Sequence, residues 1–461
     1  MDITVRPSPP PGAEAGGPAS APAIATSGLS GLVRGGVPPW LPLPFLLTGA
    51  LGAAVFGVLL PFVAPKALLA PDLPQVLALV HTATLGWLTM TIMGASLQLA
   101  PVILVSPLRA ARLARAQYPV YVVGVILLIC GFWTARPPLL IAGGVLVVVA
   151  IAHYAVILAA TLLGASPRPL SARYLAASLS YLCVVVCLGL TMALNFQLGF
   201  LNSLGWAHRL LLAHLTLGVV GWLTCTLIGV SYTLVRLFAL AHDHTDTLGR
   251  RIFVLLNAGI IGLALGFGFA WPLVRVVGGL ALVAAVWLFA WDYQQMLRAR
   301  KRKLLDVTQR HGIAAVAYLA LVMPAGVATA LFGWGRPPVI AALGLAALVG
   351  WLGQSIAGYL YKIVPFLIWQ GRYGPLVGRQ KVPLMRDLVH QRWAEVTFWL
   401  VNGALPVVLV CMVLGWVVPL QLAAAALGSG LVLAAANVFG VTVPRISRTA
   451  PDLTPARPVR P

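Results

Sequence analysis

The segment 214–236 reads HLTLGVVGWLTCTLIGVSYTLVR, an apolar run with a histidine at its start. Its core is a Gly-Trp pair with a second glycine eight positions after the first, and this pattern occurs three times: Gly86-Trp87 with Gly94, Gly221-Trp222 with Gly229, and Gly350-Trp351 with Gly358. The copies are 221 − 86 = 135 and 350 − 221 = 129 positions apart. A nearly constant period of this size predicts three tandem structural units.

Composition places these units in a membrane. Hydrophobic residues make up 60% of the 461 positions and charged residues 9%, whereas soluble domains carry roughly 25% charged residues. Apolar runs of about 20 residues recur along the chain, and each is long enough to cross a bilayer as a helix. Unbroken apolar runs exclude a β-barrel, so we predict an all-α polytopic protein whose main partner is the lipid bilayer.

The hydrophobic pattern predicts twelve spans, four in each unit. We expect them at approximately 42–64, 74–104, 118–136, 138–163, 174–197, 207–236, 252–271, 273–297, 312–334, 338–369, 393–416 and 418–443. The transmembrane domain is therefore 38–443, with repeats at about 42–163, 174–297 and 312–443. Residues 1–37 and 444–461 are rich in Pro, Ala, Gly or Arg, and we predict that both are disordered tails.

The Gly-Trp helix is the second of each predicted unit, so all three units have the same orientation. This predicts parallel repeats around a pseudo-threefold axis along the membrane normal, unlike the inverted repeats of many transporters. The alternative interpretation is that Gly-Trp with a later glycine is ordinary helix-packing chemistry, because small residues let membrane helices approach closely.

The net charge of +21 is mainly a topology signal. Basic residues concentrate in every second connection, most densely between 298 and 310, and the opposite connections and span ends hold few. Because basic loops stay on the inner side, both termini are predicted to be cytoplasmic. The basic excess therefore favours anionic lipid headgroups over nucleic acid as a partner.

Three of the eight histidines, His81, His153 and His214, are predicted to lie inside the bilayer, whereas His208 lies at the very end of its span. An ionisable side chain inside the bilayer is costly and is a functional hypothesis by default. His81 and His214 each lie about seven residues into a span from the external side, roughly 10 Å deep at 1.5 Å per residue. Both imidazoles can therefore reach the same plane of the membrane, where each can act as a metal ligand. The alternative for each is a core histidine bonded to a neighbouring helix.

The remaining histidines are predicted at interfaces or in loops: His208, His242, His244, His311 and His390. The five cysteines all lie in predicted spans without a CxxC pair, which indicates neither a disulfide framework nor a zinc module.

A strip of small residues lies on the same helical face as His214. Gly218, Gly221, Cys225 and Gly229 fall within about 60° of it at 100° per residue. The strip can accept either a planar macrocycle or another helix.

The tenth span carries polar residues that suggest a second kind of site. Gln354, Tyr359 and Lys362 could form a proton or polar path, or Lys362 could simply extend to the interface. Asp292 and Glu395 lie near the cytoplasmic ends of their spans, and we expect them to pair with basic neighbours.

Twelve spans in three arcs, with histidines near the external side of spans 2 and 6, resemble subunit I of the haem-copper oxidase superfamily, as in cytochrome c oxidase. They also resemble its bacterial haem- and copper-containing relatives linked to the nitric oxide response. The resemblance implies a b-type haem and an inner-membrane location. It implies His81 as the ligand of a low-spin haem and His214 as a copper ligand or second haem ligand.

The chain departs from that family at the oxygen-reducing centre. The family's paired histidines of span 7 and its two histidines of span 10 have no counterpart here, and neither does the HxHEM-like opening of the nitric-oxide branch. We therefore expect electron transfer, haem handling or a nitric-oxide-related role rather than full oxygen reduction, with an electron-donor protein or accessory subunit as partner. The alternative function is a cofactor-free transporter or channel.

Overall fold

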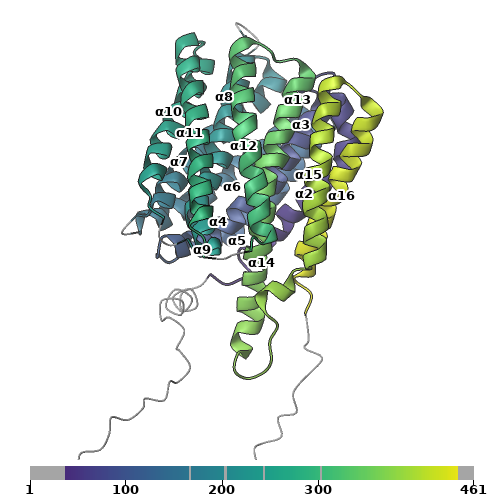
Figure 1. Cartoon of the computed structure of the whole chain (residues 1–461). Helices are drawn as coiled ribbons and strands as arrows, with labels where there is room; N and C mark the ends of the chain where they lie inside the picture. The colour runs from purple at the N-terminus through teal and green to yellow at the C-terminus, as the bar shows by residue number, and fades with distance from the viewer. Residues whose placement is uncertain (1–36, 166–167, 202–204, 242–243, 302–303, 445–461) are drawn as a thin grey trace, which may run out of the picture. The chain divides into compact units, whose positions relative to one another are not determined.

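The computed structural model describes residues 37–165, 168–201, 205–241, 244–301 and 304–444, so nearly all of both predicted tails lies outside the described residues. The described part is helical throughout, without a strand. Twelve of its helices are long and apolar enough to cross a membrane. The predicted all-α polytopic fold is confirmed (Figure 1).

Nine of these spans are single continuous helices, and three are interrupted by a π-helical segment. The continuous ones are α2 (Leu43–Ala67), α5 (Ala111–Trp133), α6 (Pro137–Leu163), α7 (Leu170–Leu198), α10 (Thr247–Gly268), α11 (Pro272–Arg298), α12 (Val307–Phe332), α15 (Gln391–Leu414) and α16 (Val417–Gly440). The interrupted ones are α3 (Pro74–His81), η1 (Thr82–Thr89) and α4 (Met90–Ile103); α8 (Trp206–Leu215), η3 (Thr216–Thr224) and α9 (Cys225–Ala239); and α13 (Pro337–Leu345), η4 (Ala346–Gly353) and α14 (Gln354–Ile368). Short turns η5 (Trp369–Tyr373), η6 (Gly374–Leu376) and η7 (Met385–Leu388) follow α14.

Local sequence sets many of the helix ends. A proline begins each of α3, α6, α11 and α13, where its missing N–H would have no helical partner. Gly199, Gly333 and Gly415 end α7, α12 and α15 with φ between 66° and 72°, a conformation that glycine adopts without strain. The observed spans lie within a few residues of the predicted ones at most ends, but α5 begins seven residues early (118 − 111) and α10 and α12 begin five residues early (252 − 247 and 312 − 307).

Helix α12 begins at Val307, five residues before the predicted start of the ninth span. Asp306 accepts a hydrogen bond from the Gln309 backbone N–H, and the Gln309 side chain accepts one from the Asp306 N–H. This reciprocal capping box satisfies two backbone donors that the helix start leaves free. It extends the helix past the apolar run and carries His311 into the bundle.

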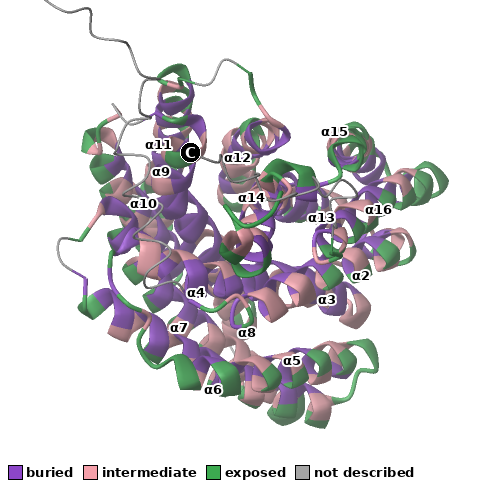
Figure 2. Ribbon diagram, turned by 90° about the horizontal axis from the view of Figure 1, so that it is seen from below, coloured by how far each residue is buried: buried purple, intermediate pink, exposed green. Residues whose placement is uncertain are grey.

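The three interrupted spans form the interior of the bundle. Their most apolar windows are 61–67% buried, whereas those of the nine continuous spans are 22–44% buried. Viewed along the helices, exposed residues face outward from the outer helices and buried residues line the interior (Figure 2). The Gly-Trp helices are therefore the inner helices, and the others surround them.

The outer helices form a closed ring. Helix α6 packs on α7, α11 packs on α12, and α16 returns to pack on α2. The last contact is close because a Cβ added to Gly57 of α2 would lie 2.8 Å from the Gly428 carbonyl oxygen of α16. One end of the ring is called the basic end. It is the end that holds the connections after α4, α6, α9, α11 and α14.

A layer of three tryptophans crosses the middle of the bundle. The indole Nε1 of Trp222 donates to Thr89 Oγ1 at 2.9 Å, and that of Trp351 donates to Thr224 Oγ1 at 3.0 Å. The third indole, Trp87, packs against Gly353. The residues that these indoles contact are Thr89, Thr224 and Gly353. Each of them lies two positions after the tryptophan of its own helix. The same contact thus links each inner helix to the next.

Candidate functional site

His81 ends α3, well away from the basic end. Its Nδ1 lies 2.8 Å from the carbonyl oxygen of Leu77, one turn earlier on the same helix. Its ring stacks on Phe132 of α5 with 4.8 Å between the ring centroids. The imidazole is half-buried and is held on one edge by the backbone and on one face by an aromatic ring.

His214 lies in the last turn of α8. Its Nδ1 is 3.1 Å from the carbonyl oxygen of Val185 on α7. Its Cε1 would lie 3.2 Å from a Cβ added to Gly189, one turn further along α7. The absence of a side chain at Gly189 is therefore what lets the His214 ring reach α7 so closely.

The two histidines share a defined tautomer. A carbonyl oxygen can only accept, so Nδ1 of each neutral ring carries the hydrogen and Nε2 carries the lone pair. Neither Nε2 has a hydrogen-bond partner among the described residues. Metal-binding histidines almost always donate their other ring nitrogen to a carbonyl or carboxylate in this way.

The donor set fits two imidazole ligands. The described residues contain no group of three or more His, Cys, Asp or Glu side chains that could hold a metal ion together. If a haem were bound, His81 and His214 are the residues that would hold its iron. A copper ion held by several histidines needs donors that these residues do not supply.

The small-residue strip beneath His214 accepts another helix. A Cβ added to Gly221 would lie 2.9 Å from Tyr181, and Gly229 lies directly against Tyr174. Both tyrosines belong to α7 and are tied down, Tyr181 by Asn257 at 2.7 Å and Tyr174 by the Gly249 carbonyl at 2.9 Å. A macrocycle therefore has no place on this strip.

His153, the third histidine of the predicted spans, is on the outer helix α6. It is half-buried, and its Nδ1 has no hydrogen-bond partner among the described residues. Nothing places it with His81 and His214.

The predicted polar residues of the tenth span do not share a partner. Gln354 exchanges hydrogen bonds with Asn402 of α15. The Tyr359 hydroxyl lies 2.8 Å from Ser231 Oγ of α9, and Lys362 Nζ lies 2.6 Å from Asp306 at the start of α12. The three side chains thus have partners on three different helices, α15, α9 and α12.

A cavity of about 40 Å³ lies between the inner helices α4, α9 and α14. Tyr359, Thr91, Ser96 and Thr226 contribute polar atoms to a lining that is otherwise apolar. This volume holds water but is far below the roughly 300 Å³ at which small-molecule sites begin.

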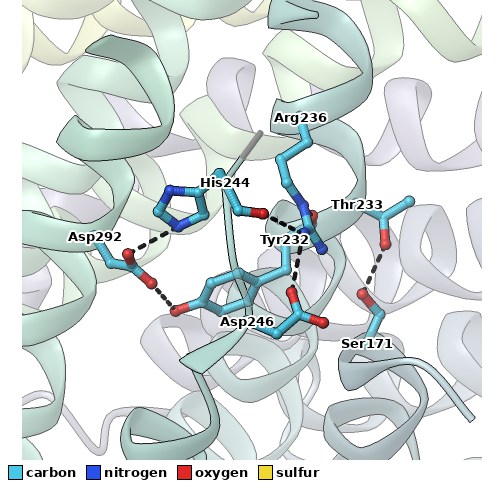
Figure 3. Close-up of polar contacts among 7 residues, drawn as sticks. All are labelled: Ser171, Tyr232, Thr233, Arg236, His244, Asp246 and Asp292. Carbon is cyan, nitrogen blue, oxygen red and sulfur yellow. Dashed lines mark hydrogen bonds and ion pairs between the residues drawn. The ribbon is translucent and has the colours of Figure 1, made fainter. Parts of the chain in front are cut away.

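A buried carboxylate lies closer to the basic end (Figure 3). Asp292 of α11 is 2% exposed, accepts a hydrogen bond from the Tyr232 hydroxyl at 2.9 Å, and lies 2.9 Å from His244 Nε2. Arg236 pairs with Asp246 at 2.9 Å and donates to the His244 carbonyl at 3.2 Å. The expected pairing of Asp292 with a basic neighbour is confirmed.

Glu395, the second carboxylate expected to pair, forms an ion pair with Arg310. His244 was predicted in a solvated loop, but it covers Asp292. His242 of the same loop lies outside the described residues.

The structure corrects the predicted position of His311. It was expected at the cytoplasmic surface, but it is 0% exposed. Its Nδ1 lies 3.2 Å from Gln354 Oε1. The Asp306 and Gln309 capping box was the sequence signal that could have placed it inside the bundle.

No protein-family model and no curated protein sequence matches this chain.

Proposed function

We propose that the chain is a haem-binding integral membrane protein similar to oxidase subunit I. His81 and His214 would hold the iron. The observation that carries the proposal is the shared geometry of the two rings, each of which donates Nδ1–H to a backbone carbonyl and keeps the lone pair on Nε2. Such bonds fix ring orientation and raise ligand basicity.

A bound haem would supply a one-electron redox centre. The chain's own residues orient the two imidazoles: Leu77 and Val185 through their carbonyls, Phe132 by stacking, and Gly189 by leaving room for the ring. The apolar helices around the site exclude bulk water, which is one of the means by which proteins tune haem potential.

Electron transfer, haem handling or a nitric-oxide-related role fits this donor set better than oxygen reduction. Two histidines would be enough to hold one haem iron, and the family's additional histidines of spans 7 and 10 have no counterpart. A bacterial inner membrane and an electron-donor protein or accessory subunit complete the proposal.

The proposal includes three parallel units around one axis. Three repeated features support it: a π-helical segment at each Gly-Trp pair, the tryptophan contact from each inner helix to the next, and ring closure by three equivalent outer contacts. The predicted alternative, a transporter with its path along this axis, is less well supported because the cavity between the inner helices α4, α9 and α14 measures only about 40 Å³.

The test is the reduced-minus-oxidised visible spectrum and pyridine haemochrome of protein purified from haem-replete cells. We expect a haem spectrum with low-spin bands. His81→Ala and His214→Ala should each remove or shift these bands, because each leaves the iron with one imidazole. A colourless, metal-free wild-type preparation would contradict the proposal.

The matched control is His208→Ala, since His208 is exposed and lies on the same helix as His214. It should keep the wild-type spectrum. If all three variants have the wild-type spectrum, haem is bound elsewhere and the ligand assignment is wrong.

A further inference from the structure

The orientation of one buried amide pair can be assigned from the backbone. Asn402 Nδ2 lies 2.8 Å from the Phe398 carbonyl oxygen, which can only accept, so this atom is the amide nitrogen. The same Nδ2 donates to Gln354 Oε1 at 2.9 Å, and Gln354 Nε2 donates to Asn402 Oδ1 at 3.0 Å. Both amides are thereby fixed.

This assignment also fixes the tautomer of His311. Its Nδ1 faces Gln354 Oε1, an acceptor, so Nδ1 carries the hydrogen and Nε2 is a lone-pair acceptor. Yet Nε2 is fully buried and has no hydrogen-bond partner among the described residues. An acceptor in this position needs a donor.

Three buried hydroxyls on the surrounding helices also have no hydrogen-bond partner within the described chain: Thr308 on α12, Tyr361 on α14 and Thr397 on α15. The Tyr361 and His311 ring centroids are 6.1 Å apart. Thr397 precedes Phe398, whose ring contacts His311 at 5.1 Å. Tyr361 lies within reach of Thr397 and Asn437, but without a hydrogen bond of normal geometry.

Ordered water is a partner that can satisfy all four groups. Each hydroxyl is both a donor and an acceptor, Nε2 is an acceptor, and water is both. Buried water typically occupies positions where several otherwise unpaired polar groups meet. One unpaired group could be tolerated, but four at one helix junction indicate a common ligand.

We propose that the junction of α12, α14 and α15 is a hydrated proton-exchange site centred on His311. A water donates to Nε2 of the neutral ring. A hydronium ion that replaces this water gives its proton to Nε2 and leaves a water behind, while Nδ1–H keeps its bond to Gln354. The site is separate from His81 and His214 and does not depend on haem.

The charged groups around the junction lie toward the basic end. Lys362 pairs with Asp306, and both are about 30% exposed, while Arg310 next to His311 pairs with Glu395. Tyr293 of α11 faces Gly312, the residue after His311. Because both ion pairs are internally balanced and partly exposed, they mark the end from which water and protons reach the histidine.

Hydroxyl-radical footprinting with mass spectrometry tests the water directly. Ordered water next to a buried side chain produces radicals there, so Tyr361 should be oxidised several-fold faster than Tyr121. Tyr121 is a matched control because it is also buried and its hydroxyl donates to the Leu85 carbonyl. Equal, near-background rates at both tyrosines would overturn the proposal.

Thr397→Val distinguishes a wet junction from a dry one. In a dry junction the variant removes an unpaired hydroxyl and raises the melting temperature. In a hydrated junction it removes a water ligand, so the melting temperature should fall and Tyr361 oxidation should slow. Thr82→Val is the control, since its buried hydroxyl bonds only its own helix at the Ala78 carbonyl. A rise with Thr397→Val would contradict hydration.

Proton exchange is measured by deuterium incorporation at the imidazole Cε1, which needs water access and depends on ring protonation. We expect His311 to exchange at a rate that depends on pH, because only an imidazole that water reaches and that can change its protonation state exchanges in this way. His390, which is exposed, serves as the positive control. If His390 exchanges and His311 does not at any pH, His311 is a packing residue and the proposal is wrong.

Discussion

At the scale of single residues, the buried side chain of Asp292 contacts a small set of polar neighbours. Asp292 is almost completely buried, so its partners come from the protein: the Tyr232 hydroxyl donates a hydrogen bond to it, and His244 Nε2 lies 2.9 Å from its other oxygen. His244 belongs to the connection between α9 and α10 and Asp292 to α11 (Figure 3). The contact therefore ties a loop at the basic end to the bundle.

Removal of His244 should leave the Asp292 carboxylate buried with too few partners. We expect His244→Ala to destabilise the protein by roughly 3 kcal/mol, measured as a lower melting temperature in detergent. The double variant His244→Ala, Asp292→Asn should recover part of this loss because it removes the uncompensated charge.

Asp72→Asn is the control for this comparison of single and double variants, because Asp72 is an exposed loop carboxylate. Its effect should stay within about 0.5 kcal/mol. Additive effects of His244→Ala and Asp292→Asn would show that the two side chains do not interact.

At the scale of helices, glycines decide how closely the inner helices and their outer neighbours pack. Gly94 meets Phe45, Gly229 meets Tyr174 and Gly358 meets His311, in each case a side chain from the first helix of the predicted unit. The same geometric position thus holds three different ring side chains. Only the third is a histidine.

Gly229→Ala tests this packing. The added methyl group would overlap the Tyr174 side chain, and overpacking of this kind costs about 1–3 kcal/mol. The melting temperature should fall. Gly403→Ala is the matched control, because Gly403 is helical and a Cβ there would meet nothing within 4 Å.

The control should be neutral or stabilising by up to about 1 kcal/mol, since alanine is the better helix former. Equal effects of the two substitutions would mean that α7 can move away from Gly229 at little cost.

At the scale of the whole molecule, the tryptophan layer separates the two ends of the bundle. His81 and His214 lie on one side of it. The cavity beside Tyr359, the Asp292 set and the His311 junction lie on the other, toward the basic end. The proposed haem site and the proposed proton site are therefore separate, and each can be tested without the other.

The charge distribution predicts which side is cytoplasmic. A single cysteine placed at Gly335, between α12 and α13, should react with a membrane-impermeant maleimide in spheroplasts, because that connection is predicted to be external. One placed at Gly378, in the connection after α14, should react only after the membrane is opened.

The background for this experiment should lack the five native cysteines, of which Cys130 and Cys187 are exposed on the helix bundle. The reverse labelling pattern would overturn the predicted orientation.

Sequence alone determined the all-α membrane fold and most span boundaries. Length and hydropathy specify where a chain can cross a bilayer without reference to other segments. It also placed His81 and His214 within membrane spans, because a histidine within an apolar run is evident from local context.

Tertiary structure alone decided what each polar side chain contacts. The strip beneath His214 could accept a macrocycle or a helix, and α7 fills it. His311 was misplaced because a capping box outside the apolar run extends α12. Its partners Gln354 and Asn402 come from helices that are distant in sequence. Hydrogen bonds between helices depend on rotation and depth as well as hydropathy, so the periodicity of one span cannot specify them.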